Sequence, residues 1–201
     1  MLRSSELRDG RCIRRRWRVD GHLTQAAVGR LSQMERTAQC QCGSLRAIAS
    51  GEPRINNVCH CRACQRRTGS VIHAGAFFLK ADVQCDGPNK IYSRRAESGR
   101  GVHLHFCPNC GTSVYWEADA APDLLGIAVG CFADPEFPAP SFSIWEEGLH
   151  SWLGLPTNIE RFQKGVGDVT RAALVMLPQP EGDTTMLGAG PTDWLPSPAS
   201  S

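Results

Sequence analysis

Seven of the ten cysteines lie in three short clusters, with the patterns C-x-C-G, C-x-C-x-x-C and C-P-x-C-G. In chain order they are Cys40, Cys42, Cys59, Cys61, Cys64, Cys107 and Cys110. Such short loops present several thiolates together, and a glycine directly after the cysteine permits a tight turn. Soft thiolate ligands select zinc, copper(I) or iron–sulfur, and zinc is the commonest outcome in the cytosol. The spacing therefore predicts metal binding.

Two other uses of clustered cysteines fit less well. Disulfides need an oxidising compartment, and residues 1–33 lack the apolar segment of a secretory signal. A redox C-x-x-C pair is typical of a βαβ context, which the sequence does not show. No stretch of 18 apolar residues is present, so no membrane contact is expected. The expected location is the cytoplasm.

The number of clustered cysteines suggests two metal sites. A structural zinc is closed by four protein ligands, whereas a catalytic zinc keeps three and an open position. The natural partition is Cys40, Cys42, Cys107 and Cys110 on one ion, and Cys59, Cys61 and Cys64 on the other. Spacing alone leaves open whether the triplet is an open site, a site with two ligands, or a second closed site completed by His60.

An open triplet would have constrained chemistry. Three thiolates give Zn²⁺ a formal charge of about −1, so water activation is a less natural role than capture of a thiol. The captured sulfur could attack an aldehyde or leave from a thiohemiacetal. Arg62, Arg66 and Arg67 could hold carboxylates of a peptide thiol, or they could form a solvated helix face.

The segments around the clusters are expected to be short strands, because they are rich in β-branched and aromatic residues and several alternate in polarity. The expected strands are Leu45–Ser50, Val71–Val83, Lys90–Ser93, Val102–Phe106, Thr112–Glu117, Leu124–Phe132 and Ser141–Trp145. A helical turn is expected at Arg62–Arg67. Without long helical periodicity, this pattern favours an antiparallel sandwich or open barrel.

The two ends of the chain differ from this central part. Residues 1–33 hold eight arginines and three acids, and residues 165–201 hold five glycines and five prolines. We therefore expect a basic leader over 1–35, one zinc domain over 36–163 and a tail over 164–201, with leader and tail mostly disordered. The formal net charge of the whole chain is only +2, so a nucleic-acid partner is not expected. The oligomeric state stays open.

The three clusters and the segments between them resemble a known family, the glutathione-dependent formaldehyde-activating enzymes, which are grouped with the centromere-protein-V domain. The resemblance covers about residues 36–163. Its segments are Cys40–Gly43, Val58–Ser70, Ala76–Phe78, Phe106–Thr112, Cys131–Pro135, Ile144–Trp145, Trp152 and Leu155–Pro156. Three clusters in this order are a specific signal, whereas a lone C-x-x-C is weak.

The resemblance implies a mainly β fold, the Mss4-like β-tent of short antiparallel sheets built around zinc sites. It implies two zinc ions per chain: a structural one on the first and third clusters and an open, catalytic one on the triplet, where glutathione would bind. His60, Arg62 and Arg66 are the expected contacts of that thiol. The implied reaction joins glutathione and formaldehyde, or splits their adduct as a carbon–sulfur lyase.

The alternative function is a non-catalytic zinc module that binds another protein. Two further residues, His103 and His105, alternate along one strand just before Cys107. They could lie behind a zinc ligand, but a solvated strand face is the preferred interpretation.

Overall fold

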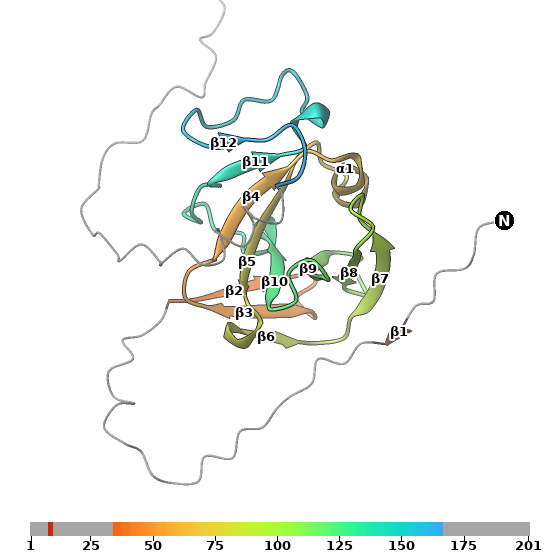
Figure 1. Cartoon of the computed structure of the whole chain (residues 1–201). Coiled ribbons are helices and arrows are strands. Elements are labelled where there is room, and N and C mark those ends of the chain that lie inside the picture. The colour runs from red at the N-terminus through yellow and green to blue at the C-terminus, as the bar shows by residue number, and fades with distance from the viewer. Residues whose placement is uncertain (1–7, 10–33, 167–201) are drawn as a thin grey trace, which may run out of the picture.

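The structure is a computed structural model that describes residues 8–9 and 34–166. A large curled sheet packs against a small one (Figure 1). In spatial order the large sheet contains β1 (Arg8–Asp9), β7 (Lys90–Arg95), β8 (Gly101–Phe106), β9 (Ser113–Ala118), β10 (Leu124–Ala128), β5 (His73–Leu79), β4 (Ile55–Cys59), β11 (Phe142–Ile144) and β12 (Glu160–Arg161). The small sheet contains β2 (Glu35–Gln39), β3 (Arg46–Ser50) and β6 (Val83–Asp86).

Most neighbouring strands are antiparallel, which confirms the expected mainly β fold of short antiparallel sheets assembled around the cysteine clusters. Two pairs were not expected: β11 runs parallel to both β4 and β12. The helical elements are α1 (Arg62–Thr68), η2 (Lys80–Asp82), η3 (Val129–Cys131) and η4 (Glu146–Gly148). None of the helices in the described residues has the length and apolar character needed to cross a membrane.

The main core lies between the two sheets. Ala47 and Ala49 on β3 point inward, and Phe78 and Ile127 meet them from the large sheet. Side chains alternate between faces along a strand. Phe77 therefore packs on the opposite face of the large sheet, against a second cluster built on Ile55, Leu124 and Phe142.

Several boundaries differ from the sequence expectation. The expected strand over 71–83 is interrupted by the η2 turn, after which β6 enters the small sheet, and the expected strand over 124–132 ends where η3 begins. The expected helical turn forms as α1. The leader and the tail fall almost entirely outside the described residues, so the domain boundaries stay a prediction.

The Trp116 side chain fits into a slot on the large sheet that two glycines leave open. Trp116 lies over Gly75 of β5 and Gly126 of β10, with its ring edge against Phe77 at 5.3 Å between centroids. A Cβ atom added at Gly75 would lie 2.9 Å from the indole, and one added at Gly126 would overlap it. The two glycines therefore leave the space that buries the indole between neighbouring strands.

Replacing Gly126 with alanine is expected to lower the free energy of unfolding by about 2 kcal/mol, because the added methyl displaces a buried ring in a packed core. Urea denaturation of the variant and the wild type measures this. Gly130→Ala is the matched control, since a Cβ there meets nothing within 4 Å. Equal stability of the Gly126 variant and the wild type would show that Trp116 does not require the slot.

Candidate metal centres and pocket

Two loops of the same design bring four cysteines together. One loop runs over residues 40–45 and the other over residues 107–112. In each loop, the N–H of the first cysteine donates to the carbonyl of the last residue, and the glycine N–H donates back to the first cysteine, all at 2.9 Å. Gly43 and Gly111 have φ values of 74° and 75°, a left-handed backbone that favours glycine. The expected turn role of both glycines therefore has a structural basis.

The sulfurs of Cys40, Cys42, Cys107 and Cys110 all lie within 4.8 Å of one another. Two of these separations are 3.5 Å, between Cys40 and Cys42, and 3.6 Å, between Cys42 and Cys107. A tetrahedral zinc bound at about 2.3 Å keeps its sulfur ligands about 3.8 Å apart. The spacing and the soft donors of this group therefore fit a zinc ion.

Several sulfurs of this group accept hydrogen bonds from the loops that hold them. The backbone N–H of Leu45 donates to Cys40 Sγ at 3.2 Å, and that of Asn109 donates to Cys107 Sγ at 3.4 Å. Hydrogen bonding by the Thr112 hydroxyl lowers the pKa of Cys110 to about 5. Hydrogen-bond donors that point at cysteine sulfurs stabilise the thiolate, which is the form in which cysteine binds a metal cation.

The second group contains Cys59, Cys61 and Cys64, whose sulfurs also lie within 4.8 Å of one another. Cys59 ends β4, and Cys61 is the N-cap residue of α1. The Cys61 sulfur accepts the N–H of Cys64 at 3.4 Å, as a capping serine oxygen would do. A strand end and a helix start therefore position all three thiols.

The three sulfurs of the triplet share negative charge unequally. The side-chain hydrogen bond with Cys59 lowers the pKa of Cys61 to about 2, and the same interaction raises the pKa of Cys59. Without a cation, the first ionisation therefore discourages the next one. Three adjacent thiolates require a positive ion among them, so the triplet also fits a soft metal ion.

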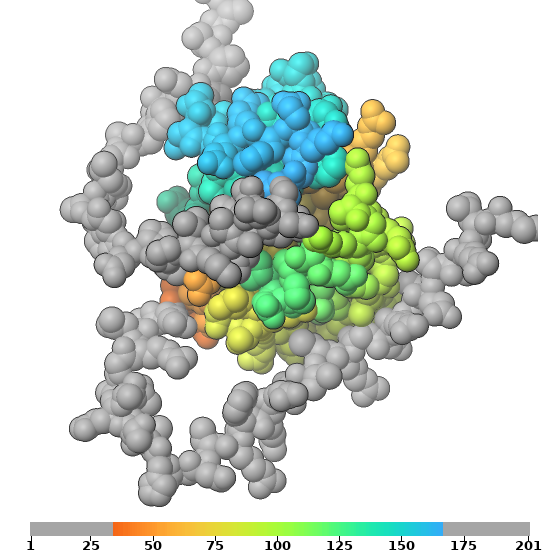
Figure 2. Space-filling view, viewed as in Figure 1, coloured from red at the N-terminus to blue at the C-terminus, as the bar shows by residue number. Residues whose placement is uncertain are grey.

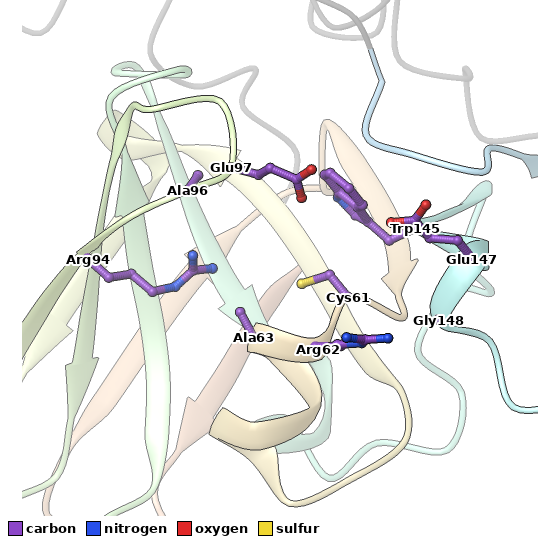
Figure 3. Close-up of a pocket in the computed structure, with 9 residues that line it drawn as sticks. All are labelled: Cys61, Arg62, Ala63, Arg94, Ala96, Glu97, Trp145, Glu147 and Gly148. Atoms are coloured by element: carbon purple, nitrogen blue, oxygen red, sulfur yellow. The ribbon is translucent and has the colours of Figure 1, made fainter.

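A cavity of about 550 Å³ opens beside the triplet, and Cys61 is the cysteine that lines it (Figure 3). Its walls are Cys61, Arg62, Ala63, Arg94, Ala96, Glu97, Trp145, Glu147 and Gly148. No cysteine of the four-sulfur group is among them. The triplet is thus accessible to a small molecule.

Of the three expected thiol contacts, Arg62 lines the cavity and the other two do not. Arg66 is exposed outside the lining, and His60 is completely buried. Burial lowers the pKa of His60 and so favours the neutral imidazole. The side-chain amide of Gln65 donates to the carbonyls of His60, at 2.8 Å, and Gly148, at 2.9 Å. Gln65 therefore joins the triplet loop to the opposite wall of the cavity.

The cavity wall includes a strained residue. Trp145 has φ 60° and ψ 43°, a left-handed conformation that is rare for a bulky side chain and costs about 1–3 kcal/mol. Its backbone N–H donates to Lys164 at 3.2 Å, and its carbonyl accepts from Gly148 at 3.0 Å. These bonds hold the indole in the wall. Of the other tryptophans in the described residues, Trp116 is buried and Trp152 is 70% exposed.

Of two further residues near the triplet, Arg67 was expected as a possible carboxylate contact and His73 was not among the expected site residues. His73 lies opposite Cys59 in the β4–β5 ladder, and burial lowers the pKa of its imidazole to about 3. Arg67 lies 5.6 Å over the Trp116 ring and is not among the residues that line the cavity. His73 was missed because it meets Cys59 only through the pairing of β4 with β5, which no local spacing in the sequence marks.

The model of a protein family described as glutathione-dependent formaldehyde-activating enzyme matches residues 35–148, more than half of the chain. The chain belongs to this family. The matched range contains both cysteine groups and every residue that lines the cavity. Family membership and these groups together indicate a metal-binding protein of this enzyme family.

A search of solved structures finds a Rhodobacter sphaeroides protein whose crystal structure comes from a structural genomics programme. It is 19% identical, with a TM-score of 0.36, and the match covers 47% of this chain and 85% of that chain. No curated protein matches this chain.

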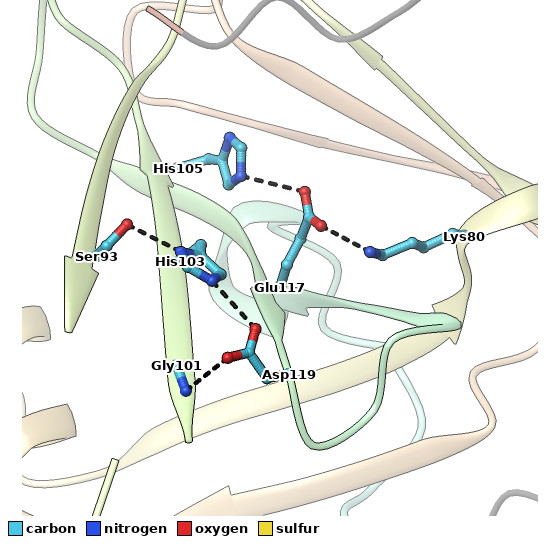
Figure 4. A network of polar contacts seen from close by, with 7 residues as sticks. All are labelled: Lys80, Ser93, Gly101, His103, His105, Glu117 and Asp119. Atoms are coloured by element: carbon cyan, nitrogen blue, oxygen red, sulfur yellow. Dashed lines mark hydrogen bonds and ion pairs between the residues drawn. The ribbon is translucent and has the colours of Figure 1, made fainter. Parts of the chain in front are cut away.

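In this family member, the two histidines before Cys107 bind strand neighbours (Figure 4). The His103 ring lies 2.9 Å from Ser93 Oγ and 3.2 Å from Asp119 Oδ1. His105 is buried, so the expectation of a solvated face is wrong for it. Its ring stacks on Tyr115, and its Nε2 lies 3.5 Å from Glu117 Oε1. The neighbouring strands and Tyr115 bury this position.

Replacing Glu117 with glutamine is expected to lower the free energy of unfolding by about 1 kcal/mol at pH 7, a modest effect because the side chain is 38% exposed. The His105 hydrogen bond, followed by Lys80 at 2.6 Å, lowers the pKa of Glu117 from 4.5 to about 2. A depressed folded-state pKa stabilises the protein above pH 4.5, and this contribution is lost as pH falls toward about 2.

Urea midpoints of wild type and Glu117→Gln between pH 7 and pH 3.5 measure this difference, and acid effects on the cysteines cancel because both proteins share them. The difference should shrink below pH 4.5. Glu136→Gln, at an exposed glutamate, is the control and should match wild type throughout. A Glu117 variant that also matches wild type throughout would show that the ion pairs contribute nothing.

Proposed function

We propose that this protein is a zinc-dependent carbon–sulfur lyase that acts on an adduct of a thiol with an aldehyde, of the glutathione and formaldehyde type. The observation that carries the proposal is that the cavity opens beside one of the two cysteine groups and not beside the other. The triplet reaches a cavity through Cys61, and the four-sulfur group does not. This favours a closed structural zinc on the four and an open zinc on the three.

In the lyase direction, the carbon–sulfur bond of an S-hydroxymethyl thiol breaks and its electron pair stays on sulfur. The hydroxyl oxygen loses its proton as the carbonyl bond forms, so the products are a thiolate, an aldehyde and a proton. The reverse direction forms the same bond, and neither direction needs an oxidant or a reductant. A zinc ion held by three thiolates would supply a position at which a thiol loses its proton at neutral pH.

The residues around the cavity would bind the metal ion, bind the substrate and exclude water. Cys59, Cys61 and Cys64 would hold the ion at the edge of the cavity, where Cys61 contacts the space open to substrate. Arg62 would bind a carboxylate of the thiol by a charge-assisted hydrogen bond. The Trp145 indole would exclude water from one side of the reacting atoms. We place the reaction within residues 36–163 and in the reducing cytoplasm, where thiols persist.

Two measurements on the purified full-length protein test the proposal. Elemental analysis is expected to give close to two zinc ions per chain. Incubation with S-hydroxymethylglutathione is expected to release formaldehyde faster than the uncatalysed reaction, at a rate proportional to protein concentration. Close to one zinc and no release above background would overturn the proposal and favour a non-catalytic zinc module.

A further inference from the structure

The cavity beside the triplet carries four charged side chains besides its sulfur. Two are cationic, Arg62 and Arg94, and two are anionic, Glu97 and Glu147. Among the described residues none of these four forms an ion pair, and Arg94 donates only to the carbonyl of its neighbour Arg95, at 3.1 Å. Unpaired charges of both signs around one cavity are complementary to a ligand that itself carries both signs.

Two of these charges come from the β7–β8 hairpin: Arg94 lies near the end of β7, and Glu97 lies in the turn that joins β7 to β8. The N–H of Ala96 donates to Arg100 at 2.8 Å, and that of Gly99 donates back to Ala96 at 2.9 Å, which fixes the turn. Figure 3 shows the Arg94 guanidinium pointing toward the Cys61 sulfur, and the Glu97 carboxylate reaching over the same space toward the Trp145 indole. A cation, an anion, a sulfur and an aromatic wall therefore surround one volume.

We propose that this cavity recognises a thiol by a free α-amino-acid end, with Arg94 binding its carboxylate and Glu97 its ammonium group. The inference rests on the proposed function for the thiol itself. The positive charge of Arg94 and the negative charge of Glu97 favour a zwitterionic ligand. A purely anionic thiol would leave Glu97 without a partner, and a neutral alkyl thiol would leave both side chains without one. A volume of about 550 Å³ accepts one amino acid or a short peptide.

Isothermal titration calorimetry with thioether probes tests the assignment, because a thioether cannot ionise to a thiolate and its binding reports the cavity walls. The probes are S-methylglutathione and its N-acetyl derivative, which lacks the ammonium charge. Zinc-replete wild-type protein is expected to bind the N-acetyl probe about tenfold more weakly, the usual effect of losing a charged hydrogen bond. The Glu97→Gln protein should bind both probes with the affinity that wild type has for the N-acetyl probe. The Arg94→Gln protein should bind each probe more weakly than wild type by the same factor, because both probes keep the carboxylate.

Glu136→Gln, outside the cavity, should bind like wild type. S-methyl-L-cysteine provides a third arm: affinity equal to that of S-methylglutathione supports a single amino acid as the thiol, and weaker affinity supports a peptide thiol. The inference is overturned if wild type binds none of the probes, if N-acetylation changes its affinity less than twofold, or if Glu97→Gln weakens both probes equally.

The outcome is separable from that of the proposed function. Protein that distinguishes the probes but releases no formaldehyde would overturn the lyase assignment alone. Protein that releases formaldehyde without distinguishing the probes would overturn the role of Arg94 and Glu97 alone.

Discussion

Replacing Cys107 with serine is expected to prevent stable folding of the protein. The side chain is completely buried in the main core, and its sulfur lies 3.6 Å from Cys42 Sγ in the four-sulfur group. Binding of a structural zinc contributes about 10–16 kcal/mol, comparable to the whole stability of about 5–15 kcal/mol of a typical domain. Loss of one of four ligands should therefore cost at least about 4 kcal/mol. Circular dichroism during thermal unfolding and the zinc content of any soluble material measure the effect.

Cys131→Ser is the matched control for this change. Cys131 packs against the same core, and its thiol lies 3.7 Å from the Ser113 carbonyl, but it belongs to neither cysteine group. Its replacement should cost about 1 kcal/mol and leave the zinc content unchanged. A Cys107 variant that unfolds cooperatively at the wild-type temperature and keeps two zinc ions would exclude a structural role for the four-sulfur group.

The parts of the fold that local sequence determines could be predicted. Neighbouring cysteines of each cluster are two or three residues apart. The strand Gly101–Phe106 follows from the alternating polarity of its sequence. The strand Ile55–Cys59 was missed because Asn56 and Asn57 at its centre are typical of turns. Both are buried here, and Asn56 Nδ2 donates to the carbonyl of Ala139 at 3.1 Å. That partner is 83 residues away, so no local pattern reveals it.

The same limit applies to the candidate site. Arg62 could be predicted as part of the cavity because it follows Cys61 directly. Arg94, Glu97 and Trp145 come from a hairpin and from the segment before η4, which only the tertiary fold brings beside the triplet. The buried position of His105 depends likewise on β7 and on stacking with Tyr115 at 4.4 Å. Pairing between distant strands decides these features, and the sequence of one strand does not encode it.

Replacing Cys61 with serine is expected to separate catalysis from folding. Serine keeps the N-cap of α1, because its hydroxyl can accept the Cys64 N–H as the thiol does now. It removes one of three soft ligands, so the zinc content should fall from close to two to close to one per chain. Formaldehyde release from S-hydroxymethylglutathione should fall at least about a hundredfold, in keeping with the several kcal/mol that a metal ion contributes to catalysis.

A second substitution at the same position separates the two roles of Cys61, as a zinc ligand and as the N-cap of α1. Cys61→Ala removes both, so it should match Cys61→Ser in zinc content and activity but be less stable by about 1 kcal/mol, the usual contribution of a helix cap. Both variants should keep the zinc of the four-sulfur group and unfold cooperatively, because that group lies on other loops of the fold. If Cys61→Ser keeps two zinc ions and full activity, the Cys61 sulfur is not a required zinc ligand. The open-site proposal then fails, while the fold and the structural zinc remain.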